Sequence, residues 1–146
     1  MTESSILSSN NSSAPSKVPS KSCTLHVCIS CRIARGTNES LGSRAGLNFY
    51  QQLRDAIDDS HLKDQVDLRP TECLSICPRP CGLALSSPGA WSYLFGDQKP
   101  NQTINDVMQC LSLYIESTDG FLPRSQRPQS MRSSILGRIP PARGDN

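Results

Sequence analysis

Two close pairs of cysteines are the residues of this 146-residue chain best suited to chemistry. The first pair lies in Cys28-Ile29-Ser30-Cys31 and the second in Cys73-Leu74-Ser75-Ile76-Cys77. Cysteines two or three residues apart reach one metal centre from a single turn of chain, and thiolates select zinc, copper(I) or iron–sulfur clusters. Two such pairs supply the four ligands of a zinc site or of a [2Fe–2S] cluster. The sequence therefore predicts a metal or iron–sulfur site built from these four thiols.

The other three cysteines differ in how close they lie to these pairs. Cys81 ends the run Cys77-Pro78-Arg79-Pro80-Cys81, and it is a candidate fifth thiol that replaces Cys73 or lies beside the site. Cys23 lies at the opposite end of its predicted strand from the first pair, and Cys110 lies beside the apolar stripe of a predicted helix. We expect both to pack as small apolar groups, which is also the alternative interpretation of the whole set.

A thioredoxin-type dithiol is the enzymatic alternative, because Cys28-x-x-Cys31 follows a predicted strand close to a strand–helix–strand unit. Two features argue against it. The predicted helix does not start at Cys31, and a dithiol enzyme has no use for Cys73 and Cys77. The sequence also lacks a Ser/His/Asp set, a Walker loop and a paired-carboxylate signature. We therefore expect an electron carrier or a metal-binding protein rather than an enzyme.

The elements that must position these cysteines form a strand–helix–strand unit. Alternating apolar residues predict strands over Thr24–Ser30 and Val66–Cys73. Apolar residues at helical spacing predict a helix between them, with Ser43 as N-cap and an end near Asp59. A crossover of this kind makes the two strands parallel neighbours. Each cysteine pair follows the C-terminal end of its strand, so we expect both at one edge of the sheet, where open α/β sheets bind ligands.

The second half of the chain predicts a hairpin and another helix. Leu83–Leu85 and Trp91–Phe95 are expected to be short antiparallel strands joined by a turn at Ser87–Gly89. Thr103 is the expected N-cap of a helix whose apolar stripe comprises Ile104, Val107, Met108, Leu111 and Ile115. The predicted order is β-α-β-β-β-α, which corresponds to an α/β fold, a single small sandwich of thioredoxin-like type.

Composition places this domain between two tails. Residues 1–22 contain nine serines and few apolar residues, which predicts a disordered tail. Residues 23–119 form the predicted domain and carry eight basic and eleven acidic residues. Residues 120–146 carry five arginines and one aspartate, and are predicted to form a solvated basic extension rich in Pro and Arg. No aromatic residue follows Phe121 to stack on bases, which argues against nucleic acid as a partner.

Hydropathy bears on the cellular location. No apolar run approaches the roughly 18 residues of a membrane span, and the N-terminus lacks the apolar core of a secretory signal. We therefore expect a cytoplasmic protein without a membrane partner. Thiols stay reduced in that compartment, and clustered cysteines there bind metal or do redox chemistry more often than they form disulfides.

The segment around the second cysteine pair resembles the thioredoxin-like [2Fe–2S] ferredoxins. In both, a C-x-x-x-C pair, here Cys73 to Cys77, precedes an apolar strand, a Pro-x-Gly turn and an aromatic strand. The chain is more closely similar to an uncharacterised family of predicted metal-binding proteins, often bacterial, which is known only as a domain of unknown function. That resemblance covers roughly residues 23–141, and it is carried by the segments Val27–Cys31, Glu72–Cys81, Tyr93–Asp97 and Arg138–Pro141.

The resemblance implies a thioredoxin-like fold and a cysteine-bound metal or [2Fe–2S] cluster, with ligands at Cys28, Cys31, Cys73 and Cys77. We therefore expect a small ferredoxin-like electron carrier. A module that binds zinc or another divalent metal for storage or delivery is the first alternative, and a dithiol oxidoreductase is the second. The mildly acidic domain suits docking to a basic redox or metal-delivery protein, and a homodimer is compatible with the sequence.

Overall fold

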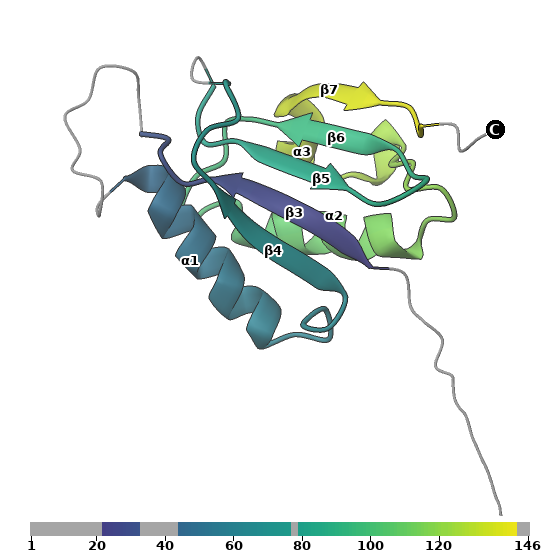
Figure 1. The fold of residues 1–146 in the computed structure, drawn as a ribbon, viewed down its shortest axis with the longest axis horizontal. Helices are drawn as coiled ribbons and strands as arrows, with labels where there is room; N and C mark the ends of the chain where they lie inside the picture. Colours follow the sequence, from purple (N-terminus) through teal and green to yellow (C-terminus); the bar gives the residue numbers. More distant parts are fainter. Residues whose placement is uncertain (1–21, 33–43, 77–78, 143–146) are drawn as a thin grey trace, which may run out of the picture.

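The computed structural model of the chain describes residues 22–32, 44–76 and 79–142 (Figure 1). The helices and strands of these residues are, in chain order, β3 (Cys23–Cys28), α1 (Ala45–Asp58), β4 (Val66–Thr71), β5 (Leu83–Ser86), β6 (Ser92–Phe95), α2 (Ile104–Glu116), η4 (Arg124–Gln126), α3 (Gln129–Ser133) and β7 (Ile135–Ile139). None of the helices in these ranges is both long enough and apolar enough to cross a membrane.

The strands of the described residues form one five-stranded sheet in the order β4-β3-β5-β6-β7. β3 and β4 are parallel, with Cys28 opposite Thr71, and every other neighbouring pair is antiparallel. The parallel pair connected through α1 confirms the predicted strand–helix–strand unit. The C-terminal ends of β3 and β4 consequently lie side by side at one end of the sheet.

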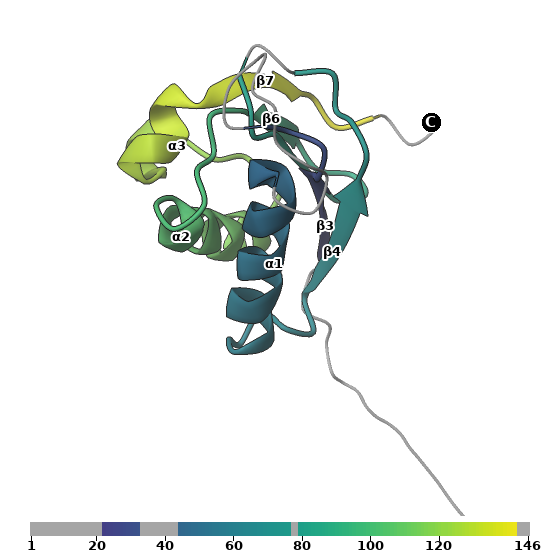
Figure 2. The same cartoon turned by 90° about the vertical axis from the view of Figure 1, so that its left-hand side faces the viewer.

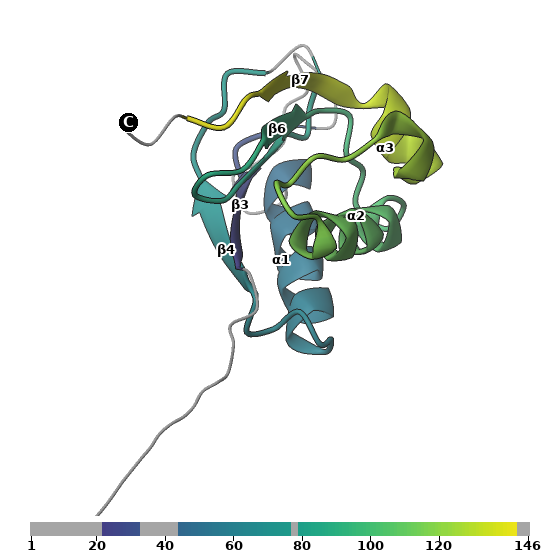
Figure 3. The same ribbon diagram turned by 90° about the vertical axis from the view of Figure 1, so that its right-hand side faces the viewer.

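The helices α1 and α2 pack against the same face of the sheet, as the two perpendicular views show (Figures 2 and 3). The side chains between the layers include Leu25 and Val27 of β3, Phe49 and Leu53 of α1, and Leu111 of α2, each at most 1% exposed. Burial of this apolar surface stabilises the two layers more than the propensity of such short helices does. The sequence pattern did not single out Phe49, although it lies at the centre of the helix's buried face.

The predicted hairpin is confirmed. β5 and β6 are antiparallel neighbours, and the Ala90 N–H donates to the Ser87 carbonyl oxygen at 3.1 Å across the turn. Gly89 has a φ of +70°, a conformation that glycine adopts without the steric strain of a Cβ atom. The turn therefore uses the Pro-Gly sequence as expected.

The start of α2 differs in detail from the prediction. Thr103 occupies the N-cap position but makes no side-chain cap, because its hydroxyl accepts a hydrogen bond from the Lys99 N–H at 3.2 Å. Asp106, in the first turn, accepts from the Ser130 hydroxyl at 2.6 Å instead of closing a capping box. That hydrogen bond ties α2 to α3, which belongs to the C-terminal part of the fold.

The fold continues past the predicted boundary at residue 119. β7 pairs with β6 from Ser92–Ile139 to Phe95–Ile135, so it completes the sheet. Leu122 and Met131 are 2% and 1% exposed and lie in the main core. The expectation of a solvated extension over residues 120–146 is therefore wrong for residues 120–139. Their apolar residues are too widely spaced among arginines and prolines to produce a periodic signal, and they become buried only because the rest of the fold offers them a surface.

Candidate functional site

Three cysteine side chains gather at the C-terminal end of β3. Cys28 is the last residue of the strand, Cys31 lies just beyond it, and Cys81 belongs to the segment that precedes β5. Their exposed fractions are 2%, 5% and 2%. Together with Ala45 they form a buried cluster separate from the main core, and Leu74 packs against it. The structure thus brings Cys81, which the sequence offered only as a fifth thiol, together with the first predicted pair.

The thiols of this cluster influence one another's pKa. Cys28, Cys31 and Cys81 belong to one buried cluster, and both of the other thiols act on the pKa of Cys31. The hydrogen bond with Cys31 and burial raise the pKa of Cys28 well above its usual value. The hydrogen bond with Cys28 lowers the pKa of Cys31, but the hydrogen bond with Cys81 and burial outweigh it, and the resulting pKa is about 11. Without a metal these two groups are therefore thiols at neutral pH, and a metal that binds them must displace protons.

The segment that follows β4 closes over Cys28. The carbonyl oxygen of Glu72 accepts hydrogen bonds from the Cys28 thiol, at 3.6 Å, and from the Ser30 hydroxyl. The backbone of Leu74 acts to lower the pKa of Cys28, and the backbone of Gly82 acts to lower the pKa of Cys31, in each case against larger causes that raise it. The predicted meeting of the two strand ends is therefore present in the structure, and it brings the segment after β4 into contact with the Cys28 thiol.

The second predicted cysteine pair is only partly described. Cys73 is exposed, and its sulfur accepts a hydrogen bond from the Ser75 N–H at 3.2 Å. Cys77 lies outside the described residues. Within residues 22–32, 44–76 and 79–142, no group of three or more His, Cys, Asp or Glu side chains is arranged to hold a metal ion. The full ligand set of Cys28, Cys31, Cys73 and Cys77 therefore remains a prediction.

The first turn of α1 packs directly against the first cysteine pair. The Gly46 N–H donates to the Cys31 carbonyl oxygen at 3.0 Å. A Cβ atom at Gly46 would lie 2.1 Å from the Cys28 carbonyl oxygen, so this approach requires glycine. Arg44 occupies the N-cap position and donates to the Ser30 carbonyl oxygen at 3.3 Å, whereas the predicted cap, Ser43, lies outside the described residues. The positive end of the helix dipole therefore lies beside the thiols, which favours negative charge there.

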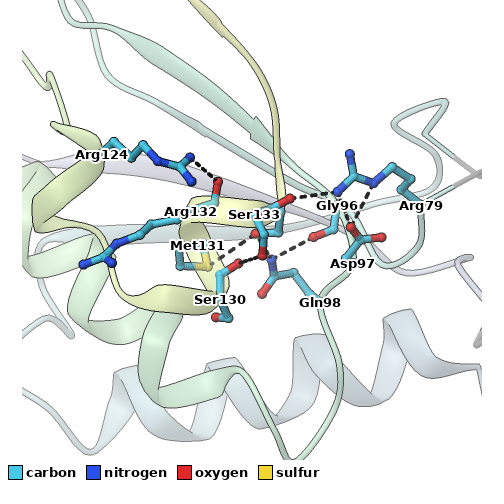
Figure 4. A network of polar contacts seen from close by, with 10 residues as sticks. Arg79, Gly96, Asp97, Gln98, Arg124, Ser130, Met131, Arg132 and Ser133 are labelled. Atoms are coloured by element: carbon cyan, nitrogen blue, oxygen red, sulfur yellow. Dashed lines mark hydrogen bonds and ion pairs between the residues drawn. The ribbon is translucent and has the colours of Figure 1, made fainter.

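A short ladder and an ion pair hold the segment that carries Cys81. The N–H and carbonyl of Cys81 exchange hydrogen bonds with the carbonyl and N–H of Gln98, both at 3.2 Å, and the Asp97 N–H donates to the Arg79 carbonyl at 2.9 Å. The Arg79 guanidinium pairs with the Asp97 carboxylate and donates to the Ser133 carbonyl at 3.0 Å (Figure 4). Cys81 is thus presented by a backbone that is fixed on both sides.

This network continues into the C-terminal part of the fold. The Gly96 N–H donates to the Ser134 carbonyl at 2.8 Å, and the buried Gln98 amide donates to the Gly96 carbonyl at 2.9 Å and to the Ser134 hydroxyl at 3.2 Å (Figure 4). The sequence interpretation assigned no role to Arg79, Asp97 or Gln98. Arg79 and Asp97 do belong to the two motif segments Glu72–Cys81 and Tyr93–Asp97, and in the structure these two segments pair with each other.

The two remaining cysteines behave as predicted. Cys23 and Cys110 lie in the main core among aliphatic and aromatic side chains. Burial, with a smaller contribution from a nearby aspartate in each case, raises the pKa of both thiols to about 12. They are therefore packing residues, separate from the cluster at the end of β3.

Solved structures with a similar fold include a thioredoxin-like [2Fe–2S] ferredoxin from Aquifex aeolicus. It is 18% identical, with a TM-score of 0.54, over 84% of this chain and 98% of that chain. A structure of the wild-type thioredoxin-like [2Fe–2S] ferredoxin from the same organism is 19% identical, with a TM-score of 0.49, over 63% of this chain and 87% of that chain. At this identity the first likeness shows the fold alone, and it confirms the predicted thioredoxin-like α/β class.

Comparison by sequence points to a family rather than to an activity. No curated protein matches this chain. The family described as "Protein of unknown function (DUF1636)" matches residues 25–141, which include β3 from its third residue and every later element through β7. The family resemblance expected from the cysteine motifs is thereby confirmed, and the chain belongs to the DUF1636 family.

Proposed function

We propose that the protein is a cysteine-ligated metal-binding protein that holds a [2Fe–2S] cluster and carries single electrons. The observation that carries this proposal is the buried cluster of Cys28, Cys31 and Cys81 at the end of β3, with Cys73 on the segment beside it. Iron–sulfur clusters take thiolate ligands, so the thiols gathered at this end of the sheet are donors of the type that such a cluster requires. The [2Fe–2S] ferredoxin that shares this fold supports the choice of cluster.

The chain's own residues suit this role in two ways. By their positions in the sequence, Cys28, Cys31, Cys73 and Cys77 would hold the cluster, which when bound accepts and releases one electron. The backbone groups of Leu74 and Gly82 act to lower the pKa of Cys28 and of Cys31, and in the same way they would stabilise the additional negative charge. Burial of the thiols excludes water from their surroundings and strengthens these hydrogen bonds.

An electron carrier also needs a partner. The excess of acidic over basic residues in residues 23–119 favours docking to a basic redox or metal-delivery protein. Association of this kind depends on ionic strength, because salt screens exposed charges.

Anaerobic purification tests the proposed function. Visible absorption and the content of iron, sulfide and zinc are measured on one sample of the full chain, with Cys31→Ala as the test variant and Cys110→Ala as a control at an equally buried cysteine outside the cluster. We expect a brown protein with about two irons and two sulfides per chain, a colourless Cys31→Ala variant and an unchanged Cys110→Ala variant.

Two other results would replace the proposal. A colourless protein with about one zinc per chain would identify the zinc-binding module. A metal-free protein that exchanges disulfides through Cys28 and Cys31 alone would identify the dithiol oxidoreductase.

A further inference from the structure

The C-terminal part of the fold is basic and contains no acidic residue of its own. Residues 120–142 include no Asp or Glu, and their four arginines are Arg124, Arg127, Arg132 and Arg138. The ion pairs of the described residues are made instead by Arg54, Arg69 and Arg79. Within the part of the chain that the structure describes, the positive charge of this segment is therefore not neutralised by ion pairs.

Arg127 is buried without a partner for its charge. The residue is 6% exposed, and its buried Nε–H has no hydrogen-bond partner among the described residues. Burial lowers the pKa of its guanidinium, and the charges of Arg124 and Arg138 lower that pKa further, so both arginines lie near enough to repel it. A buried cation without a counter-charge is unfavourable, and an anion bound beside it would stabilise it.

Asp106 does not serve as that counter-charge. The charges of Arg127 and Asp106 both act on the pKa of Cys110, so both side chains lie near this thiol. The Asp106 carboxylate, however, accepts a hydrogen bond from the Ser130 hydroxyl at 2.6 Å. No ion pair within residues 22–32, 44–76 and 79–142 joins it to Arg127.

The two neighbouring arginines are held by contacts that leave donors for a ligand. The guanidinium carbon of Arg138 lies 5.0 Å from the ring centres of both Trp91 and Phe121. Stacking of this kind uses the face of the guanidinium and leaves the N–H groups at its edge. Arg124 donates to the Arg132 carbonyl oxygen at 3.2 Å (Figure 4). Because a guanidinium has five N–H donors, both side chains are positioned and still have donors for an anion.

We propose that Arg124, Arg127 and Arg138 form a binding site for a phosphate group, either inorganic phosphate or the phosphate of a small molecule. The planar donors of arginine match the oxygen atoms of phosphate, and hydrogen bonds between charged groups are stronger than neutral ones. A cluster of three cations also favours a dianion over a carboxylate, because the dianion neutralises more of the charge.

This site is separate from the cysteine cluster and goes beyond the proposed function. Arg138 lies opposite Tyr93, Tyr93 opposite Leu85, and Leu85 opposite Leu25. This row crosses the sheet three residues before Cys28, which is roughly 10 Å along β3. Phosphate binding can therefore be tested whether or not the protein holds a metal.

Isothermal titration calorimetry of the full chain with inorganic phosphate tests the proposal, at about pH 8, where a phosphate group is dianionic. The test variants are Arg124→Gln, Arg127→Met and Arg138→Gln. Arg54→Gln is the matched control, because Arg54 also lies over an aromatic ring, that of Tyr50, but has an ion-pair partner in Asp55. We expect each test variant to weaken phosphate binding about tenfold, as loss of a hydrogen bond between charged groups does. The control should bind as the wild type does.

Thermal unfolding gives a second readout. A ligand that binds only the folded state raises the melting temperature, so phosphate should raise it in the wild type and in Arg54→Gln but not in Arg127→Met. Sodium chloride of equal ionic strength is the reference. The general stabilising effect of phosphate on proteins acts on all variants alike and so does not produce this difference.

Two further ligands identify the source and the charge of the anion. Tighter binding of glycerol 3-phosphate than of inorganic phosphate would assign the site to a small phosphorylated molecule, whereas equal or weaker binding would assign it to inorganic phosphate. Acetate at the same concentration should displace neither.

The proposal is overturned if the wild type binds phosphate no better than chloride, or if acetate displaces phosphate. It is also overturned if the test variants bind phosphate as the wild type does, or if Arg54→Gln weakens binding as much as they do. Arg124 and Arg138 are exposed, so their variants decide the matter even when Arg127→Met fails to fold.

Discussion

Buried cysteines occur in two regions of this molecule, and their neighbours differ. In the main core, Cys23 and Cys110 are surrounded by apolar side chains, and burial raises the pKa of each thiol to about 12. At the end of β3, Cys28 and Cys31 are buried just as deeply, but there a hydrogen bond between the thiols is the largest influence on the pKa of each. Burial alone therefore does not distinguish the two groups of cysteines. The group at the end of β3 differs in that its cysteines share one small cluster.

The largest expected difference between the two regions is in metal content. Cys31→Ala removes a predicted ligand whose pKa responds to both other thiols of the cluster, and we expect bound metal to fall at least about tenfold. Cys110→Ala should leave the metal content unchanged and lower only the melting temperature. Metal analysis and thermal unfolding of both variants measure this. Equal metal loss in the two variants would mean that the regions do not differ as described.

The reverse pattern is expected for a residue of the main core. Met131 is 1% exposed and packs in the core with Leu122. Met131→Ala should lower the free energy of unfolding by about 2–5 kcal/mol, through lost apolar burial and the cavity left behind, while the folded protein still binds metal. Ile139→Ala, at a side chain that is 64% exposed, is the control and should change it by less than about 0.5 kcal/mol. Urea unfolding measures the free energy of unfolding of both variants. An equally small effect of Met131→Ala would mean that residues 120–139 form the solvent-exposed extension predicted from composition.

Gly46 lies where the two regions meet. It allows α1 to begin against the turn that carries Cys28 and Cys31, and the buried face of α1 belongs to the main core. A methyl group there would meet the Cys28 carbonyl oxygen at 2.1 Å, so Gly46→Ala forces the helix away from the turn. We expect a loss of about 1–3 kcal/mol of stability, typical of overpacking, together with weaker metal binding. At Gly137 an added Cβ atom meets nothing within 4 Å, so Gly137→Ala is a matched control that should leave metal binding unchanged. Loss of stability without loss of metal would show that α1 supports only the core.

The sequence predicted those features that depend on local patterns. Alternation over Thr24–Ser30 and Val66–Cys73, with a helix between them, was enough to predict parallel neighbours and the meeting of their C-terminal ends. β7 was not predictable in this way. Its sequence is short and contains Gly137 and Arg138, and it becomes a strand because β6 offers it an unpaired edge.

The same distinction applies to the site. The C-x-x-C spacing correctly put Cys28 and Cys31 in one cluster, because two residues along a turn cannot separate them far. Cys81 pairs through its backbone with Gln98, and the exposed Cys73 lies beside a turn at Ser75, which has a φ of +59°. Neither contact has a signal in the local sequence around the cysteines, so sequence reasoning ranked Cys73 above Cys81.

The smallest effect is expected at the Arg79–Asp97 ion pair, which lies at the surface and acts on the cluster only through the backbone of Cys81. Arg79→Gln removes the charge and leaves the ladder with Gln98 in place, so we expect the metal to be lost to a chelator only several-fold faster, with little change in the amount bound at equilibrium. The control is Arg69→Gln, because Arg69 makes a comparable exposed pair with Asp67 on β4, outside the cluster of Cys28, Cys31 and Cys81. If Arg79 acts through Asp97, Asp97→Asn should accelerate the loss as much as Arg79→Gln, and the double variant should be no faster than either, since the two partners form one interaction. If Arg69→Gln accelerates the loss of metal as much as Arg79→Gln does, the effect of Arg79 is one of general surface charge. The C-terminal hydrogen-bond network then has no influence on metal binding.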